Sequence, residues 1–384
     1  MKQIYALIVM LMMASVAFTG CVSDDGDDTD DTVDPVGTES TSTLDTVIAR
    51  GSLKCGVKDS QYGMGYLEAD GTYTGLDIEY CKAVAAAIGV DTIEYVLATG
   101  SNRFELLASE EIDVLIRTTT WTTSRDADLN ADFAGMNFYD GQGILVNKDA
   151  FPDATSALHL DGAKICVGIG TTTEGNIADY FAVNEMTYEA VNSDDAATAK
   201  LQFEDGSCDA WTGDMSAMVA QKFGLDTTKV PDSAIMPELL SKEPLGAATR
   251  DNDADWNDVV TWVWFGMLTA EELGVTSANY AAEATAAAVV CERDENDNKT
   301  DSTCTDGDPG KNRLLNKNLG LGTEANPLSA TWMQAVMGAV GNYEEAYTES
   351  FCTFDSSGDC LIDRAGTLNA PWWEGGLQYA PPMR

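Results

Sequence analysis

The feature that most limits the fold of this chain is an alternation of short apolar runs with amphipathic stretches, which occurs twice. Such runs predict strands, and amphipathic stretches that end at Gly or polar residues predict helices. Alternating strands and helices are typical of α/β proteins. The first unit has expected strands at Leu53–Val57, Thr92–Leu97 and Asp113–Ile116, and expected helices at Leu76–Ile88 and Asn102–Ser109, the latter with Arg103 exposed. The second has expected strands at Lys164–Val167 and Cys208–Trp211, and expected helices at Glu174–Phe181 and Ala196–Phe203.

Two extended segments flank the second unit. Tyr139–Asn147 precedes it and Leu245–Arg250 follows it, and each reads as a connection between the units. The second unit is therefore expected to be a lobe inserted within the first, and two chain crossings of this kind form a natural hinge. We expect lobe 1 to comprise residues 43–143 and 249–384, and lobe 2 to comprise residues 144–248.

The N-terminus has the pattern of a secretory signal peptide over residues 1–20. Lys2 precedes an apolar run from Ile4 to Phe18, which is too short to span a membrane comfortably. Small residues then come directly before Cys21, an ending that resembles a lipobox and predicts a lipid on Cys21. An ordinary signal peptide or an uncleaved anchor is the alternative.

The segment after Cys21 is acidic. Val22–Glu39 contains eight Asp and Glu residues and no Lys or Arg, so it cannot bury an apolar core. We expect residues 21–42 to form a tether between a lipid and the folded part.

The remaining cysteines also favour export. An even number in an exported chain suggests four disulfides, and pairing between neighbours along the sequence is the simplest arrangement. Their spacing does not fit a zinc site, and His159 is the only histidine. The cysteines are Cys55, Cys81, Cys166, Cys208, Cys291, Cys304, Cys352 and Cys360.

The formal net charge of -41 excludes most nucleic-acid partners, because phosphates would be repelled. An acidic insertion at residues 291–312 contains Asp294, Asn296 and Asn298, whose spacing opens a calcium loop. Lys299 stands where that loop needs Gly, and no Glu follows at its twelfth position. A solvated loop without metal is therefore the expectation, and no cofactor is expected.

A polar segment, Arg117–Asp126, follows the third expected strand of the first unit. Ligands of α/β sheets bind beyond strand ends, where threonine hydroxyls and backbone N–H groups can line a polar site. Arg125 could bind a carboxylate through two parallel hydrogen bonds. The alternative is a Thr-rich loop with a surface ion pair between Arg125 and Asp126.

The second unit offers two further candidates. Gly168–Thr173 connects a strand to a helix, and helix N-terminal amides favour anions, although such turns also simply cap helices. Asp214 follows the strand Cys208–Trp211 and could receive an ammonium group. An ordinary helix N-cap is the alternative for Asp214.

The chain resembles the general L-amino-acid binding proteins of polar amino-acid ABC transporters, which belong to solute-binding protein family 3. The resemblance spans nearly all of residues 43–384 in collinear order. It implies an α/β, two-lobed type II periplasmic-binding-protein fold. The segments that carry it are Thr43–Val57, Thr74–Ala87, Arg117–Asp126, Phe133–Gly143, Gly170–Glu174, Ser241–Gly246, Ala270–Asn279 and Gly375–Arg384.

The resemblance implies a role for individual residues. Arg125 would hold the ligand carboxylate, with Thr118 and Thr120 before it and Thr172 from the second lobe. Asp214 would face the ligand ammonium. Met64 stands where the family usually has an aromatic residue over the ligand. The family also suggests the pairs Cys55–Cys81 and Cys166–Cys208, whereas Cys291–Cys304 and Cys352–Cys360 rest on sequence neighbourhood alone.

The expected function is the capture of L-amino acids outside the cytoplasm and their delivery to the permease subunits of an ABC transporter. We expect a monomer that is held at the outer face of the cytoplasmic membrane by its lipid, and that is not an enzyme. The alternatives are the ligand-binding component of a sensor, or a dehydratase on the same fold.

Overall fold

The protein is described by a computed structural model that covers residues 42–353 and 359–384. The predicted signal peptide, Cys21 and all but the last residue of the predicted tether lie outside these residues. No helix in the described part of the chain is long and apolar enough to cross a membrane.

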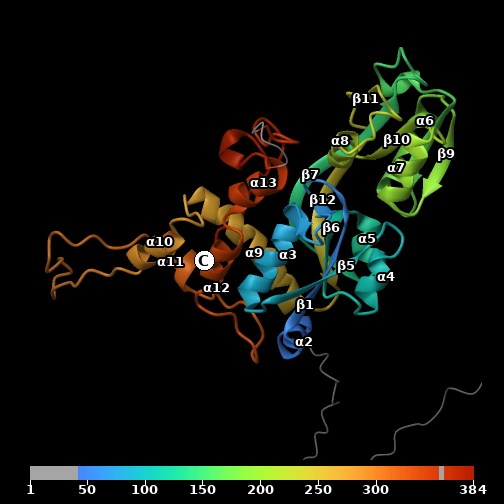
Figure 1. The fold of residues 1–384 in the computed structure, drawn as a ribbon. Helices are drawn as coiled ribbons and strands as arrows, with labels where there is room; N and C mark the ends of the chain where they lie inside the picture. The colour runs from blue at the N-terminus through green and yellow to red at the C-terminus, as the bar shows by residue number, and fades with distance from the viewer. Residues whose placement is uncertain (1–41, 354–358) are drawn as a thin grey trace, which may run out of the picture. The chain divides into compact units, whose positions relative to one another are not determined.

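A mixed sheet of nine strands organises the described residues (Figure 1). Its strands lie in the order β5-β1-β6-β12-β7-β10-β8-β9, and β11 pairs with β7. A three-stranded sheet of β2, β3 and β4 is separate from it. The strands are β1 (Ser52–Val57), β2 (Ser60–Gln61), β3 (Gly65–Leu67), β4 (Tyr73–Thr74), β5 (Thr92–Leu97), β6 (Val114–Thr120), β7 (Ala131–Asn147), β8 (Ala163–Gly168), β9 (Tyr188–Ser193), β10 (Ala210–Asp214), β11 (Ser233–Ile235) and β12 (Lys242–Arg250).

The long strand β7 belongs to both halves of the large sheet. Its first part, Ala131–Gly141, pairs with β12, and its last part, Gln142–Asn147, pairs with β10 and β11. The first half-sheet therefore consists of β5, β1 and β6 with β12 and the start of β7. The second half-sheet consists of β9, β8, β10 and β11 with the end of β7. The chain passes between the two along β7 and β12, as the sequence predicts.

Helices cover each half-sheet. The first half-sheet packs with α2 (Thr43–Arg50), α3 (Leu76–Ile88), α4 (Arg103–Ala108), α5 (Thr123–Asp128) and α9 (Ala254–Glu272), and the second with α6 (Thr172–Val183), α7 (Ala196–Glu204) and α8 (Met215–Phe223). The remaining helices are α10 (Tyr280–Ala287), α11 (Pro309–Asn316), α12 (Trp332–Ala339) and α13 (Tyr343–Phe351), with short 3-10 turns η1 (Ala157–His159) and η2 (Trp372–Glu374).

Local signals account for helix α3. It spans the predicted residues Leu76–Ile88, and Gly89 ends it in the left-handed conformation with φ 73°. Glycine adopts this conformation without the steric penalty of a Cβ atom, which is why it commonly ends helices. Most of α3 is buried, since the first half-sheet and the helices α9, α12 and α13 all pack against it.

Two predictions at the edge of the first unit were wrong. Arg103, expected to be exposed, is 2% exposed. Arg117–Thr120, expected to follow the strand, continues β6 itself, and every residue of β6 is buried. Polar composition suggested a loop, whereas pairing of β6 with β12 satisfies the backbone groups and keeps the chain extended.

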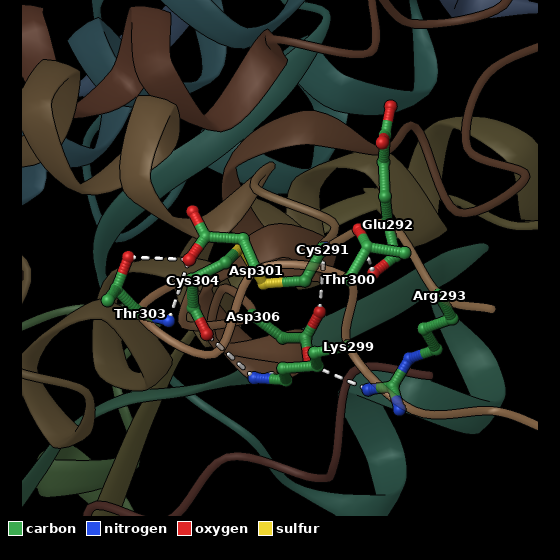
Figure 2. Close-up of a disulfide and its surroundings, with 9 residues drawn as sticks. All are labelled: Cys291, Glu292, Arg293, Lys299, Thr300, Asp301, Thr303, Cys304 and Asp306. Carbon is green, nitrogen blue, oxygen red and sulfur yellow. Dashed lines mark hydrogen bonds and ion pairs between the residues drawn. A yellow bond between two sulfur atoms is a disulfide. The ribbon is translucent and has the colours of Figure 1, made fainter.

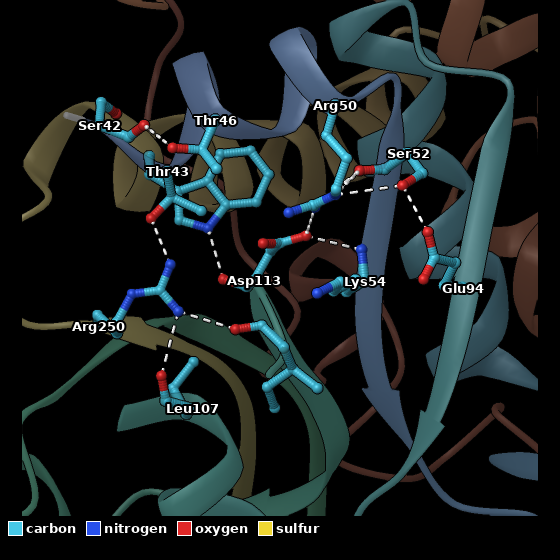
Figure 3. A network of polar contacts seen from close by, with 12 residues as sticks. Ser42, Thr43, Thr46, Arg50, Ser52, Lys54, Glu94, Leu107, Asp113 and Arg250 are labelled. Carbon is cyan, nitrogen blue, oxygen red and sulfur yellow. Dashed lines mark hydrogen bonds and ion pairs between the residues drawn. The ribbon is translucent and has the colours of Figure 1, made fainter. Parts of the chain in front are cut away.

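Polar contacts fix both ends of α2 against the first half-sheet (Figure 3). The Asp113 carboxylate forms an ion pair with Arg50, and the Asp113 carbonyl accepts Trp256 Nε1 at 2.9 Å. Arg250 on β12 donates to Thr43 Oγ1 at 2.7 Å. These contacts join α2, β12 and α9 at the end of the half-sheet where β6 begins.

The described residues contain four disulfides, Cys55–Cys81, Cys166–Cys208, Cys291–Cys304 and Cys352–Cys360. All four predicted pairings are confirmed. The first fastens β1 to α3, and the second fastens β8 to the segment before β10. Each half-sheet thus has one disulfide that joins one of its strands to a segment packed beside that strand.

Cys291 and Cys304 close the acidic insertion (Figure 2). Asp306 accepts the Cys291 N–H at 2.8 Å and pairs with Arg293 at 2.9 Å and Lys299 at 3.1 Å. The basic residues of the insertion therefore neutralise the carboxylate beside the disulfide.

The Asp294 carboxylate is used within the same insertion. It accepts the N–H groups of Asn296 and Asn298, each at 2.9 Å. In the described part of the chain, no group of three or more His, Cys, Asp or Glu residues is placed to hold a metal ion.

Candidate ligand-binding site

A cavity lies where strand ends from both half-sheets meet. The residues that line it follow, or stand at, the carboxyl ends of β1, β5 and β6 in the first half-sheet and of β8, β9 and β10 in the second. Carboxyl ends of parallel strands are the usual ligand site of open α/β sheets. The space encloses about 880 Å³, including the part open to solvent.

Close contacts join the two sides around the cavity. Gln61 Nε2 donates to Ser216 Oγ at 3.0 Å, and Arg103 Nη2 donates to the Gly170 carbonyl at 3.2 Å. A Cβ atom on Gly100 would lie 2.6 Å from the Ile169 carbonyl oxygen, so only glycine permits this approach. The two half-sheets are therefore brought together over the cavity.

Four of the predicted ligand contacts line the cavity: Thr118 and Thr120 at the end of β6, Thr172 at the start of α6, and Asp214 at the end of β10. Thr118 has a φ of 30°, an uncommon conformation for a β-branched residue. Its N–H donates to Asp77 at 3.0 Å, and its buried hydroxyl has no partner among the described residues. A buried hydroxyl of this kind is available to a ligand.

Thr120 and Thr172 share an acceptor that sequence reasoning did not single out. Glu243 Oε2 on β12 accepts the Thr120 hydroxyl at 2.5 Å and the Thr172 hydroxyl at 2.7 Å. Its other oxygen accepts Asn176 Nδ2 at 2.8 Å and the Ser241 hydroxyl at 2.5 Å. Glu243 lies in the quoted segment Ser241–Gly246, and only its position between the half-sheets reveals its role.

Arg125 lies beside the cavity and is not among the residues that line it. Its side chain is 7% exposed, and Nη1 donates to the Thr120 carbonyl at 2.9 Å. Burial lowers the pKa of Arg125, while the charges of Glu243 and Asp214 raise it. The guanidinium thus supports the end of β6 from behind.

Asp214 stands at the N-cap position of α8, yet its side chain makes no capping hydrogen bond. Burial raises the pKa of Asp214, whereas the nearby charge of Lys58 lowers it. Burial, followed by the charge of Asp214, also raises the pKa of Asp140 to about 7. The two carboxyl groups form an acidic pair, and a bound cation would favour their ionised forms.

Three cationic residues on the cavity lining were missed as site residues. Lys58 follows β1, Arg103 begins α4, and Arg117 lies within β6. Lys58 Nζ donates to Gln61 Oε1 at 2.6 Å. Burial lowers the pKa of Lys58 to about 7 and that of Arg117 to about 10. They come from three separate elements, so no motif could have grouped them.

Met64 is not brought to the cavity. It is fully buried in the core of the first half-sheet, and its backbone lies against Gly75 at the start of α3. Gly75 has a φ of 114°, and a Cβ atom there would lie 2.3 Å from the Met64 carbonyl oxygen. The placement of Met64 over a ligand, implied by the resemblance, does not agree with this packing.

Residues 53–281 match the family described as bacterial extracellular solute-binding proteins, family 3. The chain belongs to this family. This family 3 protein has the two-lobed type II periplasmic-binding-protein fold, in which the first and second half-sheets are the cores of lobe 1 and lobe 2.

Relatives match over most of its length. It is 42% identical to a glutamate/glutamine/aspartate/asparagine-binding protein of Rhodobacter capsulatus, over 91% of this chain and 95% of the relative. It is 38% identical to a general L-amino acid-binding periplasmic protein of Rhizobium johnstonii, over 90% and 94% of the two chains.

A solved structure supports the same fold. A periplasmic binding protein from Brucella ovis with glutathione bound has a TM-score of 0.77 and 38% identity, covering 90% of this chain and all of that chain (100%). The family 3 protein also matches holo ArgBP from T. maritima with a TM-score of 0.51 and 28% identity, over 62% of this chain and 97% of that one.

Proposed function

We propose that this solute-binding protein captures a free L-α-amino acid in the cavity between its lobes and delivers it to the permease of an ABC transporter. The observation that carries the proposal is the meeting of strand ends from both lobes on a cavity lined by Asp214 and by cationic side chains. A zwitterion needs both charges in fixed positions. The relatives, which include an amino-acid ABC transporter-binding protein of Escherichia coli, support the same ligand class by their names.

The proposed ammonium site is Asp214, with Asp140 close enough to raise the local negative charge. Asp214 lacks a capping bond and lines the cavity, so its carboxylate can accept hydrogen bonds from the ligand. Burial makes it costly to ionise the Asp214 carboxyl group, and an ammonium ion beside it offsets that cost. The site therefore favours an ammonium group.

The proposed α-carboxylate site is formed by Thr118, Thr120 and Thr172, with Arg125 behind them. Each threonine hydroxyl has one proton, and those of Thr120 and Thr172 are directed at Glu243. The remaining donors are the Thr118 hydroxyl and the first backbone N–H groups of α6, which have no partner within the helix. We propose these as the direct contacts, with Arg125 adding positive charge.

A thermal-shift screen of the purified protein against the twenty standard L-amino acids tests this function. Bound ligand stabilises the folded state by an amount that grows with the logarithm of one plus the ratio of ligand concentration to Kd, so at least one amino acid, at a concentration well above its Kd, should raise the melting temperature by several degrees. D-enantiomers serve as a matched control, because a D-amino acid with its ammonium and carboxylate at the same sites directs its side chain to a different part of the cavity. No shift with any L-amino acid would overturn the proposed function.

We also propose export and anchoring through a lipid on Cys21, with residues 22–42 as the tether. Lobe 1 is proposed at residues 43–143 and 249–384, lobe 2 at residues 144–248, and the protein is proposed to act as a monomer at the outer face of the membrane. Radiolabelled fatty acid should enter the protein in cells and should not enter Cys21→Ser. Equal labelling of both would contradict the anchor.

A further inference from the structure

The cavity holds more cationic side chains than one amino-acid carboxylate requires. Among the described residues that line it, Lys58, Arg103 and Arg117 are cationic, and Arg125 lies directly behind. The whole chain has only 22 Lys and Arg residues against 63 Asp and Glu. Four of the described aspartates line the same cavity, so the sign of its charge alone does not call for an anion. The observation that does is the presence of buried arginine donors without a hydrogen-bond partner among the described residues.

Arg117 is the most exceptional of these side chains. It is 7% exposed, and its Nε has no hydrogen-bond partner among the described residues. Arg103 is 2% exposed, and its Nε is likewise without a partner in the described part of the chain, but its Nη2 donates to the Gly170 carbonyl at 3.2 Å. Buried donors on a charged group are normally satisfied, because an unmet donor keeps the full cost of its desolvation.

The acidic groups nearby do not supply the missing acceptor. The Asp77 carboxylate accepts the Thr118 N–H at 3.0 Å and Asn137 Nδ2 at 3.1 Å. Burial lowers the pKa of Arg117 and the charge of Asp214 raises it, but Asp214 is the proposed partner of the ligand ammonium. Asp59, Asp194 and Asp195 also line the cavity. Asp194 and Asp195 are exposed, and Asp59 is partly exposed.

The three cations also act on one another. The charge of Arg117 lowers the pKa of Lys58 and of Arg103, so the three groups lie within electrostatic range on the lobe 1 side. Like charges held together in a buried site are stabilised when an anion lies between them. The α-carboxylate site proposed above draws on other donors, which leaves this cluster free for a second anionic group.

We propose that the ligand of this cavity carries a second carboxylate besides its α-carboxylate, and that Arg117 binds it with Lys58 and Arg103 beside it. This inference rests on the proposed function, since it assigns the remaining part of the same ligand. The second carboxylate is either the side chain of an acidic amino acid or the terminal carboxylate of a short γ-glutamyl peptide. Arg117 is thereby the residue that determines specificity.

Calorimetry with L-glutamate and L-glutamine tests the proposal, because the two ligands share size and shape and differ in one charge. The wild-type protein should bind glutamate at least about tenfold more tightly, since a site built for a charged group rejects the neutral analogue. Arg117→Gln should remove this preference and leave glutamine binding within about threefold of wild type. Arg117→Lys should retain part of the preference.

Arg313→Gln is the matched control, because it removes one positive charge from α11, outside the cavity lining. It should leave the preference unchanged. Glutathione and L-glutamate, titrated separately, distinguish the two sources of the second carboxylate: the one whose binding Arg117→Gln weakens is the natural class. If Arg117→Gln does not fold, the test rests on Arg117→Lys and on the affinities of the wild-type protein for glutamate and glutamine.

Equal affinity of the wild-type protein for glutamate and glutamine, with no binding of glutathione, would overturn the inference. Equal loss of glutamate and glutamine binding in Arg117→Gln would overturn it too, because Arg117 would then act on the α-groups. Neither result would touch the proposed function, which fails only if no amino acid binds.

Discussion

The hydroxyl oxygens of Thr120 and Thr172 lie 3.3 Å apart, although 52 positions separate the residues and they belong to different lobes. Both hydroxyls donate to Glu243 Oε2 on β12, a strand that joins the lobes. One carboxylate therefore ties the end of β6, the start of α6 and the hinge together. Contacts of this kind exist only when the lobes are close, so they stabilise that arrangement over an open one.

Glu243→Gln should weaken this link. A carboxylate can accept all four hydrogen bonds, whereas an amide offers one accepting oxygen and two donors. We expect a loss of about 1–3 kcal/mol in the free energy of unfolding, measured by urea denaturation. Glu283→Gln, at the ion pair with Lys311, should cost less than about 1 kcal/mol. Similar losses in both variants would argue against a special role for Glu243.

Asp214→Asn should weaken amino-acid binding and leave the fold as stable or more stable. The charge that meets the ligand ammonium is lost, at a cost of roughly 2–5 kcal/mol in binding free energy. Burial raises the pKa of Asp214, so the folded protein itself gains nothing from ionising it. Calorimetry and thermal melting separate the two effects, and unchanged affinity would exclude Asp214 as the ammonium partner.

Arg125→Ala should lower affinity for every amino acid. It removes the hydrogen bond to the Thr120 carbonyl and the positive charge behind the proposed carboxylate site. We expect a loss of roughly 2–5 kcal/mol in binding free energy, since the α-carboxylate would lose the cation behind its proposed donors, and the other cations of the cavity are assigned to the second carboxylate. Near-normal affinity by calorimetry would show that the α-carboxylate is held by other groups. Arg125→Lys keeps the charge and should recover part of the loss.

Affinity should depend on pH on both sides of neutrality. The pKa of Asp140 is about 7, and a ligand ammonium favours the ionised acidic pair, so binding releases protons and weakens as pH falls below about 7. The pKa of Lys58 is also about 7, and a ligand carboxylate favours its protonated form, so binding of an anionic ligand weakens as pH rises above about 7. Burial is the main cause of the low pKa of Lys58; the charges of Arg117 and Arg103 lower it further, and those of Asp214 and Asp77 raise it.

Calorimetry of glutamate and glutamine between pH 6 and pH 9 checks this dependence. Above pH 7 the preference for glutamate should shrink, and below it both ligands should lose affinity together. Lys58→Gln should remove the loss at high pH and leave the loss at low pH. A preference that stays constant across the range would contradict the role of Lys58.

Local sequence signals determined much of the fold. Helix α3 ends at Gly89 because glycine accepts a left-handed φ, and α6 begins after Thr171, whose side chain caps Glu174 N at 3.2 Å. The extended segments around lobe 2 followed from pattern. The cysteine pairs were expected from neighbourhood along the sequence and, for Cys55–Cys81 and Cys166–Cys208, from the resemblance. The helix ends and the extended segments depend on residues near one another in the sequence. The number of disulfides depends on the even number of cysteines that remain.

Tertiary structure alone decided the site. Arg103 read as exposed because α4 is a short helix with a polar side chain at its start, but the Gly170 carbonyl of the other lobe covers it. Met64 read as a ligand contact by resemblance, but it is packed in the core behind Gly75. Sequence position says nothing about what another element will place over a side chain.

The sequence by itself determined an α/β fold with two units, its crossings and the residue types that an amino acid requires. The tertiary structure decided that Lys58, Arg103 and Arg117, from three different elements, face one cavity, and that Glu243 joins Thr120 to Thr172. The physical reason is that periodicity and capping act over a few residues. Burial and charge pairing instead depend on contacts between distant segments, which exist only once the strands have paired.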